Sequence, residues 1–128
     1  MTATLAGVEA DLRAAFGEQV LRAPDGSALF VALGPIGVRV EVADVGGGDA
    51  AIEAYAWIGQ DLEITPELGL DLARRNAGLR FGALSVDDED AIILGHALFG
   101  DAAGATAVVR LVRVLAETAE ALDAELRA

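Results

Sequence analysis

The feature that most constrains the fold is a series of β-type segments joined by turns too short to contain a helix. Apolar and polar residues alternate from Val38 to Val42 and again over 52–58, which is the period of a strand with one buried face. An earlier apolar run at 27–33 ends at Gly34-Pro35, and Gly46-Gly47-Gly48-Asp49 separates the other two segments. Parallel strands would need a crossover connection of roughly a dozen residues or more. The pattern therefore predicts an antiparallel sheet.

Three further segments carry apolar residues at the spacing of an amphipathic helix. Thr65 and Pro66 suit the N-cap and the first turn of the second segment, and Gly17 suits the end of the first. The predicted helices are 3–16, 65–76 and 103–126.

Additional strands complete the predicted order of elements. They lie at 19–22, 79–86 and 91–98, and the last two are apolar on both faces, which indicates the inside of a sheet or an interface. A helix, three or four strands, a helix, two strands and a helix predict an α+β fold built on an antiparallel sheet. No repeat or long linker interrupts this order, so residues 1–128 are expected to form one domain.

Charge and cysteine content exclude several classes of function. The chain has 21 acidic and nine basic residues, all of them Arg, and its net charge is −12, so nucleic-acid and membrane-surface binding are not expected. It has no cysteine, and its uncharged stretches are shorter than the roughly 20 residues that span a bilayer. Glu9 and Asp11 do not suit a signal peptide. We expect a cytoplasmic protein whose acidity serves solubility or favours basic partners.

Few residues offer catalytic chemistry. His96, the only histidine, shares its strand face with apolar residues, which favours a structural role over that of a general base. Ser27 and Ser85 lie outside any nucleophile motif, and the chain has no lysine or cysteine nucleophile. We therefore expect no enzymatic activity and no cofactor. An enzyme that uses some of the many carboxylates remains an alternative.

Two segments resemble ligand loops only superficially. The turn Asp87-Asp88-Glu89-Asp90 has four consecutive acids, whereas a Ca²⁺ loop alternates its ligands around a glycine. The run Gly46-Gly47-Gly48-Asp49 lacks the lysine and the helix start of a phosphate loop. We expect a solvated turn and a plain flexible loop, and no metal site.

Aromatic residues on the predicted solvent-exposed face of the sheet are the candidate partner-binding site. Phe30, Tyr55 and Trp57 fall on the face that also carries Arg39 and Glu41, opposite the predicted core face. A shift of one residue in register would instead turn this set towards the core. Phe30, Tyr55, Trp57 and Arg39 are therefore predicted to contact a partner, with a role at the edge of the core as the alternative.

Apolar surface beyond what one small sheet can cover predicts a homodimer. It comes from the two strands at 79–86 and 91–98 and from the last helix, whose apolar stripe is broad. The alternative is that this helical stripe faces the core. Candidate interface residues are Leu84, Val86, Ile93, Leu111 and Val114.

The second half of the chain resembles a known group of bacterial proteins. From Leu70 it reads LDLARRNAGLRFGALSVDDEDAIILGHAL, followed by a long helix that contains LAETAEALDAEL. This sequence is similar to that of the type III secretion chaperone-like superfamily, which includes the Tir-chaperone and YbjN families. The matching positions are Asn76, Gly82, Asp87-Asp88, Ile92-Ile93-Leu94 and Ala119.

The resemblance implies a non-enzymatic and often dimeric protein that binds peptides or regulates a partner. The Arg-only composition is common in bacteria without such a secretion system, which favours a YbjN-like member. We expect a chaperone or regulatory adaptor that binds a peptide segment of another protein. A structural or regulatory homodimer without a peptide client is the alternative.

Overall fold

The computed structural model describes residues 3–101 and 103–128. Over these residues the chain forms three α-helices and one six-stranded antiparallel sheet, so the predicted α+β fold and its order of elements are confirmed. The helices are α1 (Leu5–Phe16), α2 (Pro66–Gly78) and α3 (Ala105–Arg127). The strands are β1 (Val20–Arg22), β2 (Leu29–Val31), β3 (Val38–Gly46), β4 (Asp49–Ile58), β5 (Ala83–Val86) and β6 (Ile92–Phe99), and they pair in the order β1-β2-β3-β4-β6-β5.

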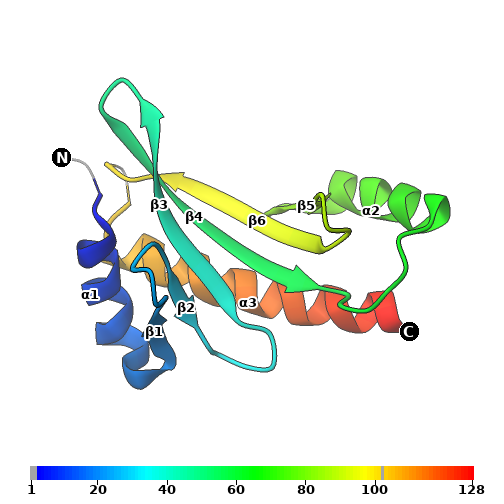
Figure 1. Cartoon of the computed structure of the whole chain (residues 1–128), viewed down its shortest axis with the longest axis horizontal. Helices are drawn as coiled ribbons and strands as arrows, with labels where there is room; N and C mark the ends of the chain where they lie inside the picture. Colours follow the sequence, from blue (N-terminus) through cyan, green and yellow to red (C-terminus); the bar gives the residue numbers. More distant parts are fainter. Residues whose placement is uncertain (1–2, 102) are drawn as a thin grey trace.

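The helices lie together on one side of the sheet. Figure 1 shows α3 running along the length of the sheet, with α1 at one end and α2 near the other. Arg75 of α2 pairs with Glu125 of α3 at 3.6 Å, and α1 packs against α3 and β1. The molecule therefore has two layers, and none of the described helices lies over the other face of the sheet.

Small aliphatic side chains fill the space between the two layers. On β4 the buried positions alternate, and Ile52, Ala54, Ala56 and Ile58 point to the helices. From the other layer, α3 buries seven residues in the same core: Val108, Leu111, Val112, Leu115, Ala116, Ala119 and Leu122. This alternation fixes the register and leaves the intervening β4 residues on the opposite face.

The glycine run between β3 and β4 is not the flexible loop that the sequence predicts. Gly46 pairs with Asp49, which leaves Gly47 and Gly48 as a two-residue hairpin turn. Their φ values are 64° and 82°, and a two-residue turn of this kind favours positive φ at both central positions. The run therefore continues both strands up to the turn, with a shift in register between Asp44 and Gly46.

The fifth strand is shorter than the predicted 79–86 and lies at the edge of the sheet, not inside it. Gly82 has a φ of +81°, which breaks the extended backbone before Ala83. The free edge is capped by Asn76 of α2, whose side-chain amide donates to the Leu84 carbonyl at 2.9 Å and accepts from its N–H at 2.6 Å. This amide takes the place of a neighbouring strand at one residue.

Candidate functional site

The sheet face turned away from the helices, here called the outer face, carries the predicted aromatic set. The register places Phe30 opposite Arg39 and Arg39 opposite Tyr55, so these residues form one row across three strands. Trp57 lies two residues further along β4, opposite Ile93 of β6. The four residues predicted to contact a partner thus come together on one open surface.

Arg39 is fixed within this row by two neighbours. Its guanidinium lies 5.4 Å from the centre of the Phe30 ring and 2.8 Å from the Glu41 carboxylate. Stacking and ion pairing hold the side chain flat on the sheet. Because Glu41 balances its charge, Arg39 adds little net positive charge to the outer face.

Tyr55 and Trp57 form the apolar centre of the outer face. Their ring centres are 6.5 Å apart, and the Tyr55 ring lies against Gly95, where a Cβ atom would come within 3.1 Å of the ring. Burial and the nearby Glu53 carboxylate raise the pKa of Tyr55 to about 12. The phenol therefore remains a neutral hydrogen-bond donor at any physiological pH.

Sequence reasoning missed the most exposed aromatic residue of this face. Phe99, at the end of β6, is 64% exposed, whereas Phe30 is 37% exposed. Phe99 pairs with Ala51 and has the strand parity of Ile93, so it lies on the outer face as well. Counting in steps of two from Ile93 through Ala97 puts Phe99 on the face of Ile93, but only the pairing of β6 with β4 shows that this is the outer face.

The five candidate dimer residues occupy three different environments. Leu84 and Leu111 are only 6% and 2% exposed and belong to the core of a single chain, so this part of the prediction is wrong. Both side chains point towards the interface between the helices and the sheet, where the apolar stripe of α3 packs against the core. Ile93 is half-buried on the outer face beside Trp57, Val114 is half-buried on α3, and Val86 is 38% exposed.

His96 and Asp87 accept hydrogen bonds from backbone N–H groups around β5 and β6. The Nδ1 atom of His96 accepts from the Gly82 N–H at 3.2 Å, and its ring stacks on Phe81 at 4.1 Å. The Asp87 carboxylate accepts from the N–H groups of Glu89 and Ala91, both at 2.9 Å. Within the described residues no group of three or more acidic or histidine side chains is arranged to hold a metal ion.

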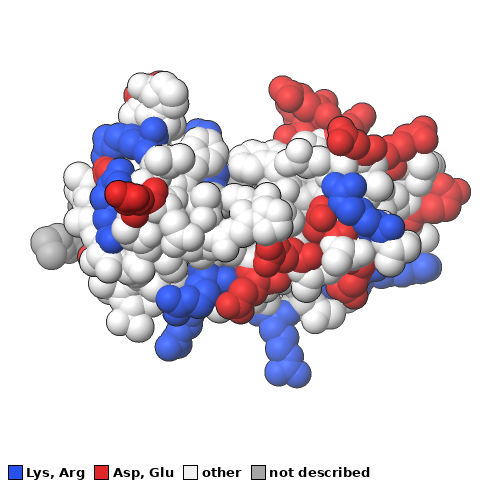
Figure 2. Space-filling model, turned by 90° about the horizontal axis from the view of Figure 1, so that it is seen from below, with Lys and Arg blue, Asp and Glu red and all other residues white. Residues whose placement is uncertain are grey.

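Acidic side chains are unevenly distributed over the surface. Figure 2 shows them gathered at the end of the molecule that carries α2 and the C-terminal end of α3. The turn between β5 and β6 adds Asp88, Glu89 and Asp90 at that end, all three exposed. A cationic ligand would therefore approach this end more readily than the other.

The described helices include none with the length and apolar character needed to cross a membrane. A comparison with curated proteins gives no match. A family model described as "T3SS (YopN, CesT) and YbjN peptide-binding chaperone 1" matches residues 3–128. The matched residues include all the helices and strands of both layers and the whole outer face. The chain therefore belongs to the family of T3SS and YbjN peptide-binding chaperones.

Proposed function

We propose that this protein binds an extended segment of a partner protein on the outer face and acts as a chaperone or regulatory adaptor without enzymatic activity. The observation that carries the proposal is the row of Phe30, Arg39 and Tyr55, with Trp57 beside it, on a sheet face that is left uncovered by the helices of residues 3–101 and 103–128. The family match to peptide-binding chaperones supports it.

The shape of the outer face suits an extended ligand. Neighbouring strands lie about 4.8 Å apart, and residues two apart on a strand are separated by about 7 Å, which is also the side-chain repeat of an extended peptide. Aromatic rings supply large contact areas at a low cost in side-chain entropy. Alternate side chains of one segment could thus lie on Tyr55, Trp57 and Phe30 in turn.

The net charge of the chain indicates which kinds of partner are favoured. A net charge of −12 opposes nucleic acid and anionic lipid and favours a partner segment with basic residues. We further propose that the protein works in the cytoplasm as a homodimer, with the exposed side chain of Val86 and the half-buried side chain of Val114 in contact with a second copy. A homodimer without a peptide client is the second candidate, because the same two side chains support it.

Affinity purification from the native host with two matched variants tests the proposed function. The double variant Tyr55→Ala/Trp57→Ala removes the apolar centre of the outer face, and Leu70→Ala removes a large apolar side chain that is 52% exposed on α2. A client of the outer face would co-purify with the wild type and Leu70→Ala but not with the double variant. Equal recovery with all three proteins would place the client outside the outer face, and no partner with any of them would favour the homodimer without a client. Either result would contradict the proposal.

A further inference from the structure

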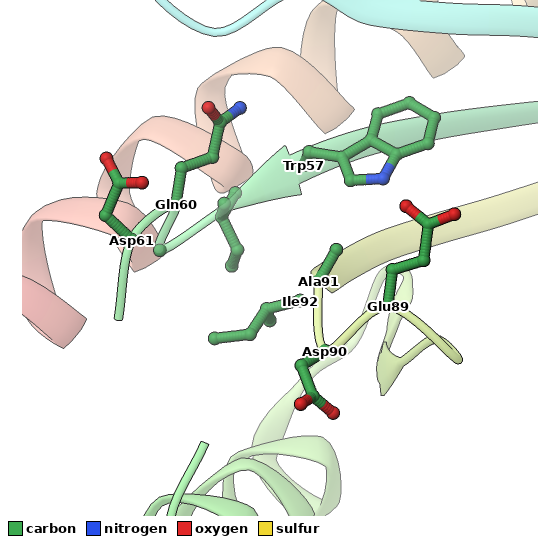
Figure 3. A pocket seen from close by; sticks show the side chains of 9 residues that line it. Trp57, Gln60, Asp61, Glu89, Asp90, Ala91 and Ile92 are labelled. Carbon is green, nitrogen blue, oxygen red and sulfur yellow. The ribbon is translucent and has the colours of Figure 1, made fainter. Parts of the chain in front are cut away.

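A small pocket lies at the end of the outer face where β4 stops and the β5–β6 turn approaches it. Its volume is about 190 Å³, which suits the end of one long side chain. Trp57 and Glu89 form two of its walls, and Gln60, Asp61 and Asp90 lie around its rim. Figure 3 shows the Glu89 side chain extending from the turn towards the indole ring of Trp57, while Asp90 points away from the ring.

The wall after β4 is held in place by α3. The Gly59 N–H donates to the Asp123 carboxylate at 2.7 Å, and Arg127 donates to the Gln60 carbonyl at 2.8 Å. The Gly59 N–H and the Arg127 guanidinium hold the pKa of Asp123 below its usual range, so this carboxylate stays charged at neutral pH. The backbone on this side of the pocket is thus fixed before a ligand arrives.

The opposite wall is held by the turn itself. Asp87 uses its carboxylate to accept the N–H groups of Glu89 and Ala91, and the Asp90 N–H donates to the Asp87 carbonyl at 3.1 Å. Asp87 is therefore occupied by backbone contacts. These contacts do not use the carboxylates of Glu89 and Asp90, so the charges of both remain available.

The charges around the pocket are not balanced by the chain. Among the described residues, Asp61, Glu89 and Asp90 make no ion pair, and no basic side chain lines the pocket. The nearby Arg127 guanidinium is already engaged with Asp123 at 3.0 Å and with the Gln60 carbonyl. A carboxylate next to an indole ring offers an ammonium or guanidinium group both an ion pair and an aromatic contact.

The pocket is continuous with the apolar surface of the outer face. Trp57 forms a wall of the pocket and its ring centre is 6.5 Å from that of Tyr55. Two strand spacings and one two-residue step separate Trp57 from Phe30, a diagonal of about 12 Å that an extended chain spans in roughly four residues. One peptide could therefore reach the pocket and Phe30 together.

We propose that this pocket takes the Arg or Lys side chain of an extended partner segment whose apolar side chains lie on the outer face. The inference rests on the proposed function and specifies its ligand: a segment with a cationic side chain about four residues from an aromatic or aliphatic one. Trp57 contacts the stem and the charge of that side chain, and Glu89 pairs with its head group.

Two synthetic peptides test the inference directly. The first is acetyl-Thr-Arg-Thr-Val-Thr-Phe-amide, and the second has citrulline, a neutral isostere, in place of the arginine; both are also measured with reversed sequence. Binding is followed through the fluorescence of Trp57, the only tryptophan of the chain. We expect the arginine peptide to bind about tenfold more tightly in low salt, with the preference reduced as salt screens the charges.

Matched variants of the acidic turn locate the effect. Glu89→Gln should abolish the preference for arginine over citrulline. Asp88→Asn removes the same charge from the same turn outside the pocket and should preserve it. Equal affinities for both peptides, or equal losses in both variants, would overturn the cation pocket while leaving peptide binding by the outer face intact. If neither peptide binds in either direction, the proposed function falls together with the inference.

Discussion

Trp57 illustrates how one residue on the outer face can matter for binding and little for folding. Its side chain is half-buried between Tyr55 and the end pocket, whereas the core positions of β4 beside it are Ala56 and Ile58. The core of the sheet is therefore complete without the indole ring.

Trp57→Ala should weaken partner binding at a small cost in stability. Truncation of a fully buried Trp costs about 3–5 kcal/mol, so we expect about 1–2 kcal/mol for this half-buried one, measured by urea unfolding. The fluorescence of the free protein should be that of a partly solvated indole and should shift to the blue when a partner binds. Strongly blue emission from the free protein, with an unfolded Trp57→Ala variant, would show that the residue belongs to the core.

Tyr55 provides a second measurement at this scale because it is the only tyrosine. Ultraviolet titration should give a phenol pKa of about 12, since burial and Glu53 oppose ionisation, and Glu53→Gln should lower it. In the unfolded chain the phenol ionises near pH 10, so the folded state loses stability as the pH rises through the window from about 10 to 12. Below that window both states are protonated and Tyr55 makes no pH-dependent contribution. A folded-state midpoint near 10 would contradict this account.

At the scale of elements, the contact between α2 and β5 is the point where the sequence pattern was least informative. The apolar run around Leu84 reads as a strand that is covered on both faces. In the structure only the Leu84 side chain is buried in the core, and the other residues of β5 are exposed. What ends the sheet there is Asn76, eight residues earlier, and its two hydrogen bonds to Leu84 have no periodic signature.

Asn76→Ala should destabilise the fold by about 1–3 kcal/mol, because it leaves a half-buried N–H and C=O of the edge strand without partners. Urea unfolding measures the loss, and amide hydrogen exchange at Leu84 should accelerate selectively. Arg74→Ala, an exposed change on the same helix, is the control and should remain within about 0.5 kcal/mol of the wild type. Unchanged exchange at Leu84 in Asn76→Ala would show that the amide does not protect the edge.

Much of the fold could be predicted because its strongest signals are local. The alternation in Val38–Val42 and 52–58 fixed the faces of β3 and β4, and with them the shared surface of Arg39, Tyr55 and Trp57. The pairing of β6 with β4 is not local, so Phe99 could not be assigned to that surface from its own segment. The packing partner of α3 was equally hidden, since a broad apolar stripe does not reveal whether Leu111 contacts its own sheet or a second copy.

At the scale of the whole molecule, two layers leave one sheet face and several apolar side chains uncovered. Val86, Phe99 and Leu70 are exposed at different places on the surface. Light scattering at tens of micromolar protein should give twice the 13.1 kDa mass of one chain, because a second copy would cover part of this area. Val86→Asp should then shift the mass towards the monomer. A mass of one subunit for the wild type would remove the homodimer from the account.

Site-specific photo-crosslinking in the native host tests whether the outer face holds an extended segment of a partner. A photoreactive phenylalanine analogue is placed at Phe30 or Phe99 on the outer face, or at Leu70 on α2 as the control. We expect crosslinks from Phe30 and Phe99 that mass spectrometry maps to one short segment of the same partner, and none to that partner from Leu70. Crosslinks to a client from Leu70, with none from Phe30 and Phe99, would contradict this expectation.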